Sequence, residues 1–179
     1  MELEILDVQQ EGHAEDRWLR RLDFLWLELT HKCNLRCVHC YASAGPSLPL
    51  VDGMTYERWR NVLEEAYTLG CRKVQFTGGE PTLHPSLPHL ITDAHSLGYE
   101  FIEVFTNGTC ISERLWQIFR SLNIHLAFSL YGSRAEVHEA VTMREGSFSK
   151  TLTSISRAVE EGLTVRVAII EMAQNTHDV

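Results

Sequence analysis

The chain has no apolar run near the roughly 18 residues that a membrane-spanning helix needs, and its acidic N-terminus carries no signal-peptide pattern. Basic residues are few: 16 Lys and Arg stand against 24 Asp and Glu, giving a net charge of −8. The longest basic block is Arg20-Arg21, whereas a nucleic-acid-binding surface needs clustered basic side chains. We therefore expect no membrane partner, no nucleic-acid partner and a cytoplasmic location.

Cysteine is also scarce, with five residues in 179, and three of the five lie within eight positions. That distribution does not suit the disulfide framework of a secreted protein and favours a reducing compartment. Cys71 and Cys110 stand apart and are expected to be small core or near-core residues. The length and the 44% apolar content are those of a globular domain that can bury a core.

The three clustered cysteines are Cys33, Cys37 and Cys40, in a Cys-x3-Cys-x2-Cys array that follows an apolar run at 24–30. Thiolates suit iron–sulfur clusters, zinc and copper(I). Closed sites normally take four protein ligands, so three thiolates on a four-iron cube leave one iron open to a substrate. A zinc knuckle or a redox Cys-x-x-Cys pair is the alternative. His39 could be a fourth zinc ligand, although its position between two cysteines predicts a side chain that points away.

Strand and helix patterns alternate from residue 24 onward. Strands are predicted at 24–30, 72–77, 101–105, 124–130 and 163–170. Helices are predicted from an N-cap at Thr55 to a stop at Gly70, and at 86–97, 112–121 and 149–161, with a long loop between the fourth strand and Gly146. Single helices between strands predict a parallel α/β sheet with right-handed crossovers.

Polar motifs follow the predicted strands at the same end. The cysteine loop follows the first, Gly-Gly-Glu-Pro at 78–81 the second, Thr-Asn-Gly at 106–108 the third, and Ser129 ends the fourth. Parallel α/β folds place their active sites at the C-terminal ends of the strands. The sequence therefore predicts one site at this edge.

The cysteine array and Gly-Gly-Glu-Pro together resemble the radical S-adenosylmethionine (radical SAM) enzymes. Within that family the chain is most similar to the peptide-modifying maturases that carry a SPASM domain. This narrower likeness rests on the motifs at 106–108, 128–132 and 143–148 and on His138, and the whole resemblance covers about residues 24–170. It implies a partial parallel (β/α)6 barrel, a [4Fe–4S] cluster, and reductive cleavage of S-adenosyl-L-methionine to a 5′-deoxyadenosyl radical.

The resemblance also implies roles for individual residues. Cys33, Cys37 and Cys40 would ligate the cluster, and the residues expected to bind S-adenosylmethionine are Tyr41, Gly78, Gly79, Glu80, Ser129 and Arg144. The glycines would let backbone approach the ligand, and Glu80 would accept a hydrogen bond from its amino group. Arg144 is the candidate for a carboxylate contact. Asn107 is interpreted as a turn residue. Tyr131 departs from the Asp that many relatives carry at this position.

We expect residues 1–23 to be an N-terminal extension and 24–179 to be the radical SAM core. The sequence stops soon after the fifth predicted strand, where 175–178 resembles the N-cap of a further helix. An exposed terminal strand edge is unfavourable. We therefore expect a barrel truncated after the fifth strand, with any auxiliary-cluster domain in the missing part.

The leading functional hypothesis is modification of a ribosomal precursor peptide, with an electron donor such as flavodoxin or ferredoxin as a further partner. One alternative is a radical SAM enzyme of cofactor biosynthesis or sulfatase maturation. The other is a metal-bound electron-transfer or scaffold module without enzymatic activity.

Overall fold

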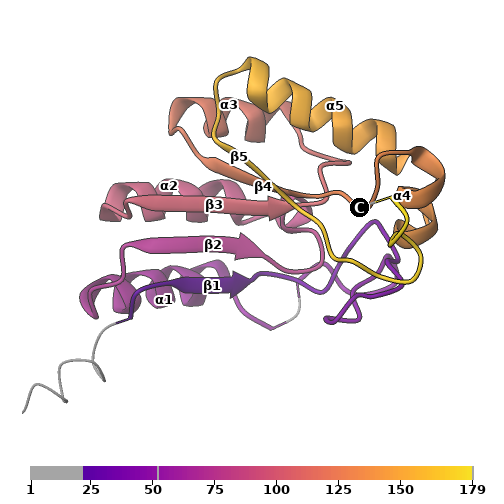
Figure 1. Ribbon diagram of the computed structural model, residues 1–179. Coiled ribbons are helices and arrows are strands. Elements are labelled where there is room, and N and C mark those ends of the chain that lie inside the picture. Colours follow the sequence, from indigo (N-terminus) through magenta and orange to yellow (C-terminus); the bar gives the residue numbers. More distant parts are fainter. Residues whose placement is uncertain (1–21, 52, 179) are drawn as a thin grey trace, which may run out of the picture.

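The computed structural model describes residues 22–51 and 53–178, and its five strands form one parallel sheet in chain order (Figure 1). The strands are β1 (Leu25–Glu28), β2 (Lys73–Thr77), β3 (Phe101–Thr106), β4 (His125–Ser129) and β5 (Val165–Ala168). They are joined through α1 (Tyr56–Thr68), α2 (Leu87–Leu97), α3 (Glu113–Ser121) and, after β4, α4 (Ala135–Thr142) and α5 (Ser147–Glu160). A 3-10 turn, η2 (Pro81–Leu83), follows β2. The predicted α/β architecture is confirmed.

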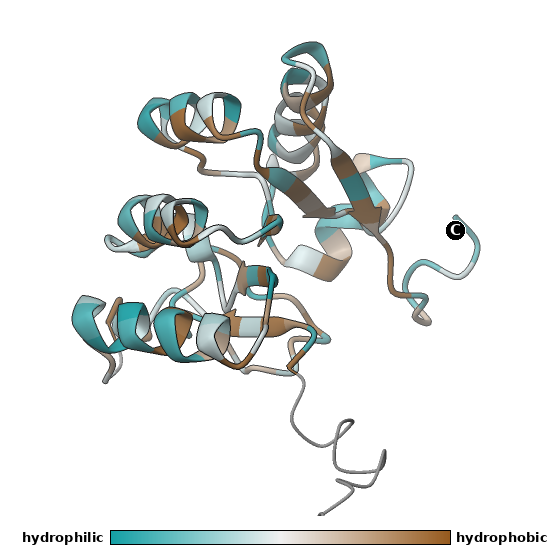
Figure 2. Cartoon of the chain, turned by 90° about the vertical axis from the view of Figure 1, so that its left-hand side faces the viewer, coloured by the Kyte–Doolittle hydropathy of each residue, from teal (hydrophilic) through white to brown (hydrophobic). Residues whose placement is uncertain are grey.

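One face of the sheet carries the hydrophobic core. A single row of register partners crosses all five strands and consists of Leu27, Phe76, Val104, Leu126 and Val165. The first four of these side chains are buried, and the helices pack against them. Figure 2 shows the sheet curved, with the helices along its outer side. Because side chains alternate along each strand, a second set of side chains points to the inner face of the sheet.

The inner face is polar in its middle. Glu103 on β3 is buried, and its carboxylate accepts hydrogen bonds from the Gln75 side-chain amide and from Arg166, whose Nη2 lies 2.8 Å from Oε1. Arg166 also stands over the Phe105 ring at 5.3 Å. A buried carboxylate needs such partners to be tolerated. Trp26, 55% exposed, lies beside Gln75 in register on the same face.

The long loop predicted between the fourth strand and Gly146 is wrong, because it contains the helix α4. Val137, His138, Val141 and Thr142 are buried along one side of that helix. This helical spacing was present in the sequence but is short, and no side chain caps the helix at Arg134. Met143 ends it in the left-handed conformation at φ 54°. The helix brings His138 and Thr142 to the C-terminal edge of the sheet.

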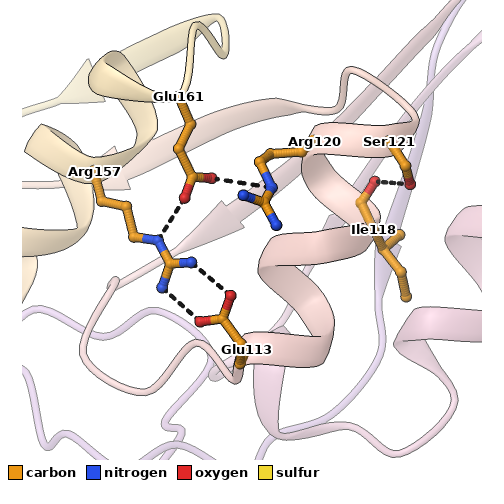
Figure 3. Close-up of polar contacts among 6 residues, drawn as sticks. All are labelled: Glu113, Ile118, Arg120, Ser121, Arg157 and Glu161. Carbon is orange, nitrogen blue, oxygen red and sulfur yellow. Dashed lines mark hydrogen bonds and ion pairs between the residues drawn. The ribbon is translucent and has the colours of Figure 1, made fainter.

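Ion pairs join α3 to α5 (Figure 3). The Arg157 guanidinium donates to both carboxylate oxygens of Glu113 at 2.8 Å, and its Nε donates to Glu161 at 2.8 Å. It also lies 4.5 Å above the Trp116 ring, and Arg120 approaches Glu161 at 3.7 Å. A network of this kind fixes geometry better than an isolated surface pair does. It holds α5 against α3.

The segment after β5 returns to the loop after β4. Asn175 is fully buried, and its Nδ2 donates to the carbonyls of Tyr131 and Ile170 at 3.0 and 2.9 Å. The Asp178 carboxylate accepts from the Ser133 backbone N–H at 2.6 Å. Residues 173–178 form turns, so Asn175 ties two loops together and does not cap a helix within the described chain. This contact fixes the backbone beside Ser129.

No helix within residues 22–51 and 53–178 combines the length and the apolar character that crossing a bilayer requires. Of the predicted N-terminal extension, 1–23, residues 1–21 lie outside the described part of the chain. The division into an extension and a core therefore stays a prediction.

Candidate functional site

A cavity of about 410 Å³ lies at the C-terminal edge of the sheet. Its size is within the range of small-molecule sites. The wall includes, among the predicted site residues, Cys33, Cys37, Cys40, Tyr41, Gly78, Gly79 and Ser129. The loops after β1 and β2 and the end of β4 therefore meet here, as the parallel topology predicts. Glu80 and Arg144 are not among the wall residues.

The cysteine loop folds back on itself, and two of its backbone N–H groups donate hydrogen bonds to cysteine sulfur atoms. The Gly45 N–H donates to the His31 carbonyl at 3.1 Å and closes the loop. Leu35 N–H donates to Cys33 Sγ at 3.4 Å, and Ala44 N–H donates to Cys40 Sγ at 3.3 Å. Hydrogen bonds to cysteine sulfur orient a metal ligand and tune the bound metal.

Burial raises the pKa of the Cys33 thiol to about 11 and that of Cys37 to about 12. A bound metal reverses this preference, since a coordinating thiol is deprotonated outright. Within residues 22–51 and 53–178, no three His, Cys, Asp or Glu side chains come close enough to share one metal ion. The three thiols thus share a wall without converging on one point. This all-sulfur donor set fits an iron–sulfur cluster held by Cys33, Cys37 and Cys40.

Gly78 and Gly79 bring the loop after β2 against the cysteine loop. Gly79 N–H donates to the Thr30 carbonyl at 2.6 Å, and Glu80 N–H donates to the Lys32 carbonyl at 2.8 Å. A Cβ on Gly79 would lie 2.5 Å from the Lys32 oxygen, and Gly78 adopts φ +139°. The resemblance implies that the glycines make room for a ligand. In the structure they also make room for the backbone that carries the cysteines.

Glu80 is fully buried and its carboxylate is already bonded within the protein. Oε1 accepts from Thr82 N–H at 3.0 Å, Thr82 Oγ1 at 2.7 Å and Thr106 Oγ1 at 2.7 Å, while Oε2 accepts from Asn107 N–H at 2.8 Å. Burial raises the pKa of Glu80, and these hydrogen bonds oppose the rise. The predicted contact between Glu80 and the ligand amino group stays a prediction, and the geometry gives the carboxylate a second role.

The sequence favours Asn107 as a turn residue that supports the third strand. Its Oδ1 does accept from Thr109 N–H at 2.9 Å, which is a turn contact. Its Nδ2, however, donates to Asn34 Oδ1 at 2.9 Å and approaches Cys33 Sγ at 3.8 Å. Asn107 also lines the cavity. Its place directly after β3, at the edge that carries the other motifs, was the signal that could have found it.

Aromatic side chains also line the cavity. Tyr131 is buried, with its ring 4.8 Å from His39 and 5.6 Å from His138. Its backbone N–H donates to His138 Nδ1 at 3.2 Å. Burial raises the pKa of Tyr131 to about 12, against a hydrogen bond with Ser129 that lowers it. His39 lines the same cavity as the cysteines, with its ring against Tyr131, and the expectation that it points away from a centre shared by the cysteines stays a prediction.

The sequence model of the radical SAM superfamily matches residues 27–175. The chain belongs to the radical SAM superfamily. These enzymes use a [4Fe–4S] cluster and S-adenosylmethionine, and related solved structures contain bound S-adenosylmethionine. The three cysteines and the cavity fit both cofactors, and their roles in binding them stay predictions.

Several characterised radical SAM proteins are similar to this chain. The Bacillus subtilis antilisterial bacteriocin subtilosin biosynthesis protein AlbA is 29% identical over 154 residues, covering 85% of this chain and 34% of AlbA. A GTP 3′,8-cyclase from Petrotoga mobilis is 29% identical over 150 residues, covering 83% of this chain and 46% of the cyclase. The crystal structure of Streptococcus suis SuiB superposes with a TM-score of 0.77 at 18% identity, covering 89% of this chain and 35% of SuiB. The radical SAM chain spans about a third to a half of these relatives.

Two predicted binding residues lie at or outside the rim of the radical SAM cavity. Tyr41 is 71% exposed, and its hydroxyl donates to the Glu28 carboxylate. Arg144 is exposed, with Nη1 3.4 Å from the Asn34 carbonyl. The neighbouring Thr142 lines the cavity instead. The geometry therefore favours Thr142 over Arg144 as the residue of this segment that faces a ligand.

Replacing Arg144 by alanine tests that placement. An exposed side chain with one long hydrogen bond should change S-adenosylmethionine affinity by no more than about 0.5 kcal/mol. A direct ion pair with the ligand carboxylate would instead cost about 1.5–3 kcal/mol. Equilibrium dialysis with labelled S-adenosylmethionine separates the two, with Arg60→Ala on α1 as the control for loss of an exposed arginine. A loss above tenfold would show that Arg144 reaches the ligand.

Proposed function

We propose that this chain is the radical SAM core of an enzyme that abstracts a hydrogen atom from a ribosomally made precursor peptide. Three relatives support a peptide substrate. AlbA is named for subtilosin biosynthesis, SkfB of Bacillus subtilis is a sporulation killing factor maturation protein, and SuiB has been solved with its precursor peptide SuiA. SkfB is 29% identical over 154 residues.

The observation that carries the proposal is the apolar and aromatic rim of the cavity. Besides the cysteines, its wall includes Trp26, Phe105, Tyr131 and Ile170. Trp26 and Ile170 are 55% and 52% exposed, so they present apolar surface beside the cluster cysteines. Exposed aromatic and aliphatic side chains around a concave site suit an apolar side chain of a bound peptide.

The chemistry divides between cofactors and protein. When bound, the cluster supplies the electron that cleaves S-adenosylmethionine to methionine and the 5′-deoxyadenosyl radical, which then takes a hydrogen atom from the substrate. Cys33, Cys37 and Cys40 would hold the cluster, and Ser129 lines the same cavity. Tyr131 and His39 pack against each other at the cavity wall and would limit access of water. Flavodoxin or ferredoxin is the electron donor we propose.

A second candidate is cofactor biosynthesis. The Petrotoga mobilis GTP 3′,8-cyclase and an Fe-coproporphyrin III synthase from Methanosarcina barkeri are each 29% identical to this chain, as AlbA is. A sulfatase-maturing role, which the family resemblance also allows, is a third; the structure of anSMEcpe with bound S-adenosylmethionine, at 20% identity and a TM-score of 0.66, supports the shared fold. Similarity alone does not rank these substrates. The apolar rim favours a peptide side chain over a triphosphate, which binds through arginine, lysine or backbone amides.

The test uses the full-length protein, reconstituted without oxygen and supplied with a chemical reductant. The substrate is a candidate precursor peptide whose gene lies beside the gene for this protein, made with perdeuterated side chains. Deuterium should transfer from this peptide into 5′-deoxyadenosine, and the peptide itself should be modified. Trp26→Ala should slow this coupled reaction about tenfold, the effect of losing one good apolar contact, while cleavage without peptide continues. Deuterium transfer from 3′-deuterated GTP, with none from peptide, would assign the second candidate function.

A further inference from the structure

A chain of contacts runs from Glu80 through Asn107 to Cys33. These residues follow β2, β3 and β1 respectively, so they are distant in sequence and meet only at the C-terminal edge of the sheet. The Glu80 carboxylate accepts from the Asn107 backbone N–H at 2.8 Å. The Asn107 Nδ2 then lies 3.8 Å from Cys33 Sγ, a long contact that remains within reach for a sulfur acceptor.

The surroundings hold Asn107 in one orientation. Its Oδ1 is occupied by the Thr109 N–H and hydroxyl, at 2.9 and 2.6 Å. Its backbone carbonyl accepts from Thr151 Oγ1 on α5 at 2.7 Å. Because both oxygens are engaged from elsewhere, the amide nitrogen faces the cysteine loop. There it donates to Asn34 and approaches Cys33.

A turn role accounts for the Oδ1 contacts but not for the direction of Nδ2. An Asx turn needs only the side-chain oxygen, and the amide nitrogen is then free to face solvent. Here Asn107 is partly buried and lines the cavity beside the cysteine. Glu80 is fully buried and is not itself part of the cavity wall, but its carboxylate accepts hydrogen bonds from two wall residues, Thr106 and Asn107.

We propose that Asn107 is a positioning residue that donates an N–H···S hydrogen bond to Cys33, and that Glu80 serves the cluster by holding Asn107 in place. A donor at a ligating sulfur stabilises the more negative, reduced cluster over the oxidised one and raises its reduction potential. The proposal depends on membership of the radical SAM superfamily and not on the peptide substrate. It is tested without substrate and without S-adenosylmethionine, so its failure leaves the proposed function intact.

The test is redox titration of the full-length, anaerobically reconstituted protein, followed by EPR. Asn107→Ala removes the donor without adding charge. It should lower the equilibrium constant for one-electron reduction by roughly tenfold, which is about 59 mV toward more negative potential. Asn61→Ala on α1 is the matched control, because it removes an exposed asparagine that is not part of the cavity wall. An unchanged potential in Asn107→Ala, or an equal shift in Asn61→Ala, would overturn the proposal.

A double-mutant cycle tests the part assigned to Glu80. If Glu80 holds Asn107, then Asn107→Ala should shift the potential less in a Glu80→Gln background than in the wild type, since the donor is already loosened there. The cycle subtracts the change in charge that Glu80→Gln brings by itself. Equal shifts in both backgrounds would show that Glu80 does not act through Asn107.

Wild-type protein provides a measurement that does not depend on how the variants load iron. With asparagine side chains labelled with 15N, pulsed EPR of the reduced cluster should detect a coupling to an asparagine nitrogen near Cys33. Absence of that coupling would contradict the hydrogen bond even if every Asn107 variant failed to bind a cluster.

Discussion

Replacement of Cys33, Cys37 or Cys40 by alanine is expected to abolish the cluster and with it all cleavage of S-adenosylmethionine. Wild-type protein reconstituted without oxygen should bind about four irons per chain, because three cysteine ligands on a four-iron cube leave one iron open. Each cysteine lies on the wall of the same cavity, so losing any one leaves two thiolates and too few ligands. Iron content and the brown charge-transfer absorbance measure the effect.

Cys71→Ala and Cys110→Ala are the matched controls for that experiment. Cys71 is fully buried in the hydrophobic core, and its Sγ donates to the Lys73 carbonyl at 3.2 Å. Cys110 lies beside Thr82, with the two side chains 3.5 Å apart, and is not part of the cavity wall. Both variants should keep the absorbance and the iron. Stoichiometric zinc in protein prepared without oxygen would contradict the cluster assignment.

The sheet can be predicted because the sequence patterns that specify its strands and helices are local. Each strand shows an apolar run or an alternation of apolar and polar residues, and each long helix shows a 3.6-residue period. Thr55 is predicted correctly as the N-cap of α1, where its side chain accepts from Arg58 N–H. α4 was missed because two turns give a weak period. Its Arg134 side chain makes no capping bond, so neither signal of a helix start was strong.

The meeting of the motifs was predictable too, but their roles were not. Parallel strands bring their C-terminal loops to one edge, and this places Cys33, Gly79 and Ser129 on one wall. Which way a carboxylate turns at that edge depends on partners from other loops. Glu80 faces Thr106 and Asn107, residues that follow it by more than twenty positions, and no local pattern encodes that choice.

Gly79 shows most clearly how these loops depend on one another, and Gly79→Ala is expected to be the most damaging single-methyl change at the site. The added Cβ would lie 2.5 Å from the Lys32 carbonyl oxygen and 2.9 Å from that of His31, both backbone atoms of the cysteine loop. Neither can move without shifting Cys33. Overpacking of this kind costs about 1–3 kcal/mol or more, and it should also stretch the 2.6 Å bond from Gly79 N–H to the Thr30 carbonyl.

The measurements for Gly79→Ala are the urea midpoint of the apoprotein and the iron bound after reconstitution, and both should fall. Gly45→Ala is the matched control, since Gly45 belongs to the same loop and a Cβ there meets nothing within 4 Å. Its three hydrogen bonds, to His31 and from Cys33 and Leu48, use backbone atoms only and survive the change. If the two variants bind iron and unfold alike, the close approach of the loops after β1 and β2 does not hold the cysteines in place.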